Sequence, residues 1–80
     1  MGVVVAKIRV LPKEDVDIEE LKKSIDFAEV MEEKPFVFGL KVLEILVKVP
    51  DAAGGLEPIE EKLRKNKLVS SYEVLEVGRI

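Results

Sequence analysis

The acidic side chains are the first place to look for chemistry, because an acid–base enzyme built on this chain would have to use them. The 80-residue sequence contains no histidine and no cysteine. That composition excludes imidazole or thiolate zinc sites, disulfide bonds and nucleophiles activated by a histidine base. Three adjacent pairs of carboxylates occur next to lysines: Glu19 and Glu20, Glu32 and Glu33, Glu60 and Glu61. No apolar run would desolvate them, so we interpret the pairs as solvated surface and expect no catalytic residue and no enzyme activity.

Two short motifs could bind ions. Asp51 precedes an Ala-Ala-Gly-Gly run and could ligate Mg²⁺, although a turn or helix-capping role explains it more simply. Gly54 and Gly55 open a predicted helix, whose N-terminus attracts anions. They lack the further glycines or the lysine of the known phosphate-binding fingerprints. We therefore predict neither a metal site nor a bound cofactor.

Length and charge limit the classes of function further. The chain has thirteen basic and sixteen acidic residues spread along it, for a formal net charge of -3. This dispersion gives no broad cationic face, so direct nucleic-acid binding is not expected. No apolar stretch is longer than a short strand, which predicts no membrane segment and a cytoplasmic location. We expect one domain over residues 1–80, too small to enclose a substrate-sized cavity.

The hydrophobic pattern of the first half predicts a strand, a short helix and a brief strand. Apolar residues alternate over residues 3–11, and Pro12 ends that strand. Asp17 stands at an N-cap position with Glu20 three residues later, ahead of apolar residues at helical spacing. A brief strand is predicted over residues 27–31, followed by a polar break at residues 32–35.

The second half predicts a long strand, a turn, a helix and a last strand. Residues 37–49 are apolar on both faces, which is typical of a central strand. A turn over residues 50–55 leads to a helix whose first turn tolerates Pro58. Residues 68–77 form the last strand, with broken alternation that indicates a bulge or edge irregularity. The order βαββαβ predicts an α+β, ferredoxin-like sandwich: a four-stranded antiparallel sheet with two helices on one face.

The two phenylalanines of the stretch KPFVFGLKV, residues 34–42, do not fit their surroundings. Phe36 and Phe38 lie between Pro35 and Gly39, where a chain turns, instead of inside an element. Ordinary packing explains same-face aromatics two residues apart. The flanking turn residues argue that Phe38 lies at a loop tip. The residue pattern alone leaves both interpretations open, and it leaves the C-terminal Gly78-Arg79-Ile80 equally open, since most termini fray.

Several segments together resemble the archaeal translation elongation factor 1-beta family. The similarity runs through DIEELKK, KPFVFGLKVL, VKVPDAAGG and SYEVLEVGRI, and is most specific at FGLK, Phe38 to Lys41. A basic residue before a terminal aliphatic, here Arg79 and Ile80, is the second match. Between Ile25 and Phe36 the chain is several residues shorter than the family pattern.

The resemblance implies a guanine-nucleotide exchange factor whose partner is the GTPase elongation factor 1-alpha. It implies partner-binding roles for Phe38, Gly39, Lys41, Arg79 and Ile80. Phe38 would insert into a pocket of the GTPase, Lys41 would flank it, and Arg79 would reach toward the phosphate and Mg²⁺ region. Phe36 is assigned to the domain's own core. The free protein is expected to be a monomer.

Other functions fit the same architecture, because this fold hosts many. A metabolite sensor that dimerises through its sheet and a ribosome-associated protein are the main alternatives. A small hydrolase is a third, although the sequence offers it no paired nucleophile and base.

Overall fold

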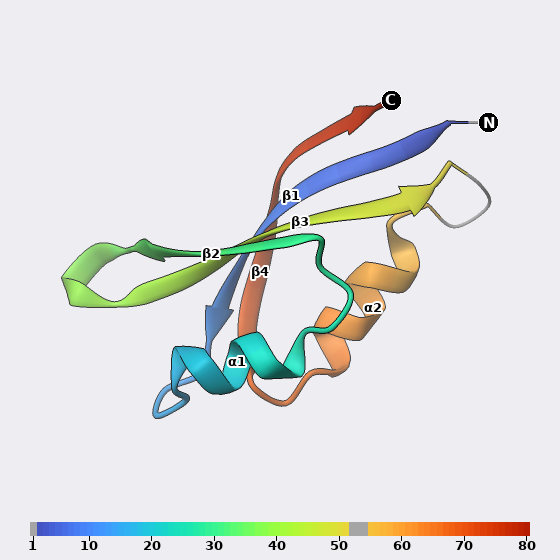
Figure 1. Ribbon diagram of the computed structural model, residues 1–80. Helices are drawn as coiled ribbons and strands as arrows, with labels where there is room; N and C mark the ends of the chain where they lie inside the picture. Colours follow the sequence, from blue (N-terminus) through green and yellow to red (C-terminus); the bar gives the residue numbers. More distant parts are fainter. Residues whose placement is uncertain (1, 52–54) are drawn as a thin grey trace.

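The computed structural model describes residues 2–51 and 55–80 and consists of one open sheet with helices on one side (Figure 1). The elements follow the predicted order βαββαβ: β1 (Val3–Pro12), α1 (Ile18–Ser24), β2 (Val30–Pro35), β3 (Lys41–Pro50), α2 (Glu57–Lys65) and β4 (Val69–Arg79). A short turn, Val37–Gly39, connects β2 to β3. The four strands are antiparallel in the order β2-β3-β1-β4, so the predicted ferredoxin-like fold is confirmed.

The sheet buries one face and leaves the other open. Central strands β1 and β3 pair so that Ile8 lies opposite Ile45 and Val10 opposite Leu43, all fully buried. Alternate residues of the same strands, such as Lys7 and Lys48, are exposed on the open face. The central position predicted for the strand of residues 37–49 is therefore confirmed, because β3 has a neighbour on each side.

Both helices cover the buried face, as predicted (Figure 1). Leu21 of α1 and Leu63 of α2 are almost completely buried and belong to one cluster with the central strands. Asp17 caps α1, since its carboxylate accepts a hydrogen bond from the backbone N–H of Glu19 at 3.1 Å. Pro58 lies in the first turn of α2, where a missing N–H costs nothing.

A polar cluster fastens α2 to β4. The Tyr72 hydroxyl donates to Glu60 at 2.9 Å and accepts from the Arg64 guanidinium at 3.1 Å, and Arg64 also donates to Glu57 at 2.9 Å. The bond to Glu57, followed by that to Tyr72, raises the pKa of Arg64. These hydrogen bonds hold α2 against the edge strand β4.

The structure corrects the predicted limits of the second and third strands. The polar residues 32–35, predicted as a break, form most of β2, and residues 27–29 precede that strand. A polar edge strand is stable because it needs hydrogen-bond partners on one side only, and charged side chains protect its free edge. The third strand begins at Lys41 rather than residue 37, because Pro35 already pairs with Lys41 and the residues between them form the turn.

The predicted irregularity of the last strand is confirmed. Lys7 lies opposite Glu76, whereas Ile8 lies opposite Val74, so Leu75 is an extra residue in β4. A second register shift occurs between Leu11 and Pro12. The predicted turn at residues 50–55 falls partly on residues 52–54, which lie outside the described part of the chain. None of the described helices is long and apolar enough to cross a membrane.

Candidate partner-binding site

The connection between β2 and β3 is a tight turn that carries Phe38 at its outermost point. We call residues 36–40 the hairpin tip; in Figure 1 it lies at the far left, beyond both helices. The Leu40 N–H donates to the Val37 carbonyl at 3.2 Å, and the Phe36 N–H donates to the Leu40 carbonyl at 2.7 Å. Phe38 and Gly39 both have positive φ, 58° and 74°. Positive φ at both central residues is the hallmark of the type I′ hairpin turn.

Phe38 is unusual in both its backbone and its exposure. The left-handed conformation suits glycine, asparagine or aspartate, and costs other residues roughly 1–2 kcal/mol. Gly39 meets this requirement without strain, but Phe38 does not. The Phe38 side chain is also 97% exposed, so its own fold gains no burial from it. A strained, solvent-exposed aromatic indicates a role outside folding.

The tip exposes more apolar surface than the sequence indicated. Val37 and Leu40 are 55% and 59% exposed and flank the Phe38 ring. Both were assigned to the long strand, because an apolar run does not reveal where a strand stops. Gly39, preceded by Phe38 and placed between two strands, was the residue that could have indicated a type I′ turn here. Beside the tip, Leu40 and Phe36 help to line a surface hollow of about 450 Å³.

Phe36 packs on its own domain, but not in the main core. Its ring is partly buried and lies 5.7 Å from the guanidinium carbon of Arg9. Arg9 is on the open face, where it pairs with Glu73 of β4 at 3.4 Å. The assignment of Phe36 to the core is thus corrected: it covers the open face at the base of the hairpin, because the turn begins directly after it.

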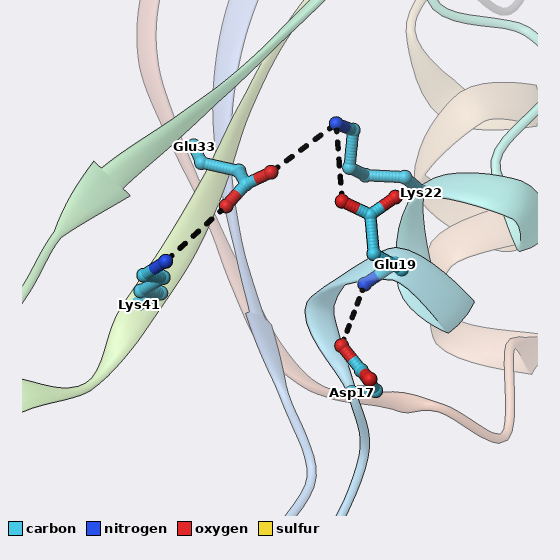
Figure 2. Close-up of polar contacts among 5 residues, drawn as sticks. All are labelled: Asp17, Glu19, Lys22, Glu33 and Lys41. Atoms are coloured by element: carbon cyan, nitrogen blue, oxygen red, sulfur yellow. Dashed lines mark hydrogen bonds and ion pairs between the residues drawn. The ribbon is translucent and has the colours of Figure 1, made fainter.

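Lys41 lies in a network of charges that joins the hairpin to α1 (Figure 2). Its ammonium is 3.7 Å from one oxygen of Glu33, while the Lys22 ammonium donates to the other at 3.2 Å. Lys22 also lies 3.8 Å from Glu19. The hydrogen bond from Lys22, aided by the charge of Lys41, lowers the pKa of Glu33. Glu33 therefore connects the base of the tip to the first helix.

The C-terminus is held in place instead of frayed. The Ile80 N–H donates to the Val3 carbonyl at 2.8 Å, and the Val3 N–H donates to the Ile80 carbonyl at 3.3 Å. The Asp51 N–H donates to the Gly2 carbonyl at 3.0 Å, and the Asp51 carboxylate lies 3.3 Å from Arg79 Nε. We call the five residues Gly2, Val3, Asp51, Arg79 and Ile80 the terminal clasp. They join the ends of three neighbouring strands.

Strand alternation sends Arg79 and Ile80 to opposite faces of the sheet. Arg79 lies opposite Val4, whose side chain is on the helix side. Ile80 pairs with Val3 and therefore points to the open face. Their side chains are 73% and 79% exposed. Asp51 is the partner of Arg79 rather than a helix cap, since the residue at the N-cap of α2 is Leu56.

The five sequence-predicted residues therefore form two separate groups. Phe38, Gly39 and Lys41 gather at the start of β3, and Arg79 with Ile80 lies beyond its other end, where Pro50 pairs with Val3. At about 3.3 Å per residue, the ten residues of β3 separate the groups by roughly 30 Å. The protein is 41 Å long, so the groups occupy its two ends. Among the pockets formed by the described residues, none is lined by both groups, but one large partner could touch both.

The acidic side chains of the described residues do not gather into a metal site. Within residues 2–51 and 55–80, no group of three or more acidic side chains is arranged to hold a metal ion. Gly54, one of the two glycines considered for phosphate binding, lies outside the described residues. Exposed apolar residues at two ends of a small sheet are typical of a surface for another protein.

Comparison with known proteins agrees with that geometry. The family model described as the EF-1 guanine nucleotide exchange domain matches residues 5–80. The chain is 44% identical over 88 positions to an elongation factor 1-beta of Methanothermobacter thermautotrophicus, covering 100% of this chain and 99% of the relative. It is 39% identical over 89 positions to one of Methanosarcina barkeri, covering 100% of both. A third, from Methanobrevibacter smithii, is 36% identical over 88 positions, covering 100% of this chain and 99% of the relative.

The alignments also bear on the length of the chain. The aligned regions are 88 and 89 positions long, although this chain has 80 residues. The relatives therefore contain several residues that have no counterpart here. That such residues fall between Ile25 and Phe36 stays a prediction.

Proposed function

The chain belongs to the EF-1 guanine nucleotide exchange domain family, and on that premise we propose that it promotes release of GDP from elongation factor 1-alpha, so that GTP can enter. The proposed activity belongs to translation elongation in the cytoplasm. It breaks no covalent bond, so no catalytic residue, metal or cofactor is required of this chain. Residues 1–80 would act as one exchange domain, and the free protein as a monomer.

Exchange by this route is a problem of coupled binding. If the exchange factor weakens the binding of nucleotide to the GTPase, nucleotide must weaken the binding of the exchange factor by the same factor. A loss of roughly 4 kcal/mol in nucleotide affinity corresponds to about a thousandfold. Contacts to the phosphates and to Mg²⁺ are the ones whose disruption would give such a loss. The exchange factor needs binding energy of its own to offset that loss.

The exposed ring of Phe38 is the single observation that carries the proposal. It is 97% exposed on a backbone held by a tight turn, so a partner meets it already positioned. Aromatic anchors contribute large contact area with little rotamer entropy to lose. Gly39 permits the turn, and Lys41 adds a cation at its base. This end of the molecule would supply the affinity.

Arg79 would act at the other end. Its exposed guanidinium lies roughly 30 Å from the tip along β3. A partner that holds Phe38 could therefore meet Arg79 at a different part of its own surface. There the cation would compete with the metal for the negative charge of the phosphates. Ile80, on the opposite face, would add apolar contact at the same sheet end.

Release of a fluorescent GDP from purified elongation factor 1-alpha tests the proposal. The wild-type chain should accelerate release, and Phe38→Ala should slow the accelerated release by about 30-fold or more, the loss expected of a buried aromatic anchor. The thermal midpoint of Phe38→Ala should stay close to that of wild type, since the ring is solvent-exposed. Val37→Ala is the matched control, because it shortens an apolar side chain in the same turn that is 55% exposed, compared with 97% for Phe38.

The control outcomes separate the possible roles of the ring. Equal losses of thermal stability and of exchange in Phe38→Ala would make the ring structural. No acceleration by the wild-type chain would contradict the proposed function altogether. In that case, a stable dimer whose melting temperature rises with a metabolite would indicate a sensor instead.

A further inference from the structure

The ion pair between Asp51 and Arg79 is better fixed than an ordinary surface pair. Asp51 is anchored by its N–H to the Gly2 carbonyl at 3.0 Å. Arg79 lies in β4, opposite Val4 of β1, and the next residue exchanges two backbone hydrogen bonds with Val3. The backbone at Asp51, and the backbone next to Arg79, are therefore hydrogen-bonded to the start of β1. Their 3.3 Å contact joins two rigid supports.

The contact uses only one part of the guanidinium. The nitrogen that faces the Asp51 carboxylate is Nε, the one nearest the backbone. Among the described residues, no ion pair or hydrogen bond is found for the two terminal nitrogens of Arg79, and the side chain is 73% exposed. A guanidinium is planar, so an ion pair on its Nε side favours one direction of the whole group. Its outer edge, with four N–H donors, then remains directed at solvent.

We propose that Asp51 is a positioning residue: it holds Arg79 by Nε so that the outer guanidinium edge is presented, already oriented, to an anionic group on the partner. This inference rests on the proposed function, since the anion is taken to be the phosphates of the nucleotide on the GTPase. A bidentate contact between guanidinium and phosphate requires that orientation. An unrestrained arginine would lose rotamer freedom when it bound.

An opposite role for Asp51 gives opposite predictions. A carboxylate beside Arg79 also reduces its positive charge, so Asp51 could hold the cation back from the phosphates. If it acted in that way, any substitution that removes the negative charge would accelerate exchange. If it positions Arg79 through the ion pair, removal of the negative charge should slow exchange instead. The two roles are therefore distinguished by Asp51→Asn.

The experiment compares Asp51→Ala and Asp51→Asn in the fluorescent-GDP release assay with elongation factor 1-alpha. Asp51→Ala should slow the accelerated release roughly three- to tenfold, since misplacement of a contact group costs rate. Asp51→Asn should slow release to a similar extent, because the neutral amide keeps the shape of the carboxylate but not the charge that attracts Arg79. In an Arg79→Ala background, Asp51→Ala should cause no further loss, as expected of residues that act as a unit.

A measurement that needs no partner keeps this inference separate from the proposed function. The ¹⁵N relaxation of the Arg79 Nε–H should show an ordered group in wild type and a mobile one in Asp51→Asn and in Asp51→Ala. The thermal midpoints of all three should agree within about 3 °C, since the pair is at the surface.

Each other outcome overturns the inference. Faster release in both Asp51 variants would show that the carboxylate restrains Arg79. Equal rates in all three proteins, or a mobile Nε–H in wild type, would show that the contact positions nothing. A loss that persists in the Arg79→Ala background would show that Asp51 touches the partner itself. No acceleration by wild type, with an ordered Nε–H, would reject the proposed function but not the clasp geometry.

Discussion

The hairpin tip and the terminal clasp present exposed side chains in two different ways. At the tip, the Phe38 side chain is exposed, and a backbone turn with two positive φ values sets its direction. At the clasp, the backbone is an ordinary strand end, and a side-chain contact from Asp51 sets the direction of Arg79. A short rigid ring needs only a fixed backbone, whereas a long flexible cation also needs a fixed side chain.

The two regions also differ in how they are joined to the rest of the fold. The clasp ties together the ends of β1, β3 and β4. The tip extends beyond the helices, and the network of Lys22, Glu33 and Lys41 joins its base to α1 (Figure 2). We therefore expect substitutions at the clasp to lower the rate of exchange more than binding, loss of the Phe38 ring to lower both, and substitutions in the network below the tip to affect stability.

Removal of the cationic end should give the largest difference between the loss of exchange rate and the loss of binding. Deletion of Arg79 and Ile80 should slow GDP release roughly ten- to a hundredfold, the loss expected for a charge-assisted contact. Binding to the nucleotide-free GTPase should fall much less, because Phe38 remains. Release kinetics and a binding titration on the same samples measure both. Arg79→Ala controls for the lost backbone bonds to Val3, and an unchanged release rate would remove the terminus from the mechanism.

Relief of the strained turn should have a smaller effect on function. It should also stabilise the fold. Phe38→Asn places a residue that tolerates the left-handed conformation at φ 58° and removes no buried surface. It should raise the free energy of unfolding by about 0.5–1 kcal/mol while binding to the GTPase weakens. Urea denaturation measures the first quantity. A destabilised Asn variant would mean that the ring supports its own fold.

The smallest effect should come from the charge network at the base of the tip. The pKa of Glu33 is lower in the folded protein than its usual value of 4.5, so its contribution to stability is present above pH 4.5 and is lost as the pH falls through the folded pKa. The difference between the thermal melts of wild type and Glu33→Gln should therefore be present at pH 6 and shrink as the pH falls below 4.5. Identical curves over that range would mean that the network adds nothing measurable.

The sequence predicted the core of the fold better than its ends. Alternation over residues 3–11 and the helical spacing around Leu21 and Leu63 reflect burial, which these side chains show. The limits of β2 and β3 were wrong because charged residues 32–34 form an edge strand and apolar residues 37–40 form an exposed turn. Hydrophobic pattern measures burial, and at these two places the structure does not follow it.

The candidate site was predictable only in part. A phenylalanine before a glycine between two strands indicated a loop tip, and the structure places the ring there fully exposed. The contact between Asp51 and Arg79 could not be foreseen, because it joins residues 28 positions apart whose approach depends on strand register. The opposite orientation of Arg79 and Ile80 likewise depends on register rather than on local pattern.

The extra residue Leu75 decides which side of the molecule carries its last positive charge. Upstream of it, even-numbered residues of β4 such as Tyr72 face the helices; downstream, odd-numbered ones such as Arg79 do. Had β4 continued without that insertion, the Arg79 guanidinium would lie on the open face, out of reach of Asp51. Ile80 would then lie on the helix side. A single aliphatic residue, four positions before Arg79, therefore decides which face of the sheet Arg79 and Ile80 occupy.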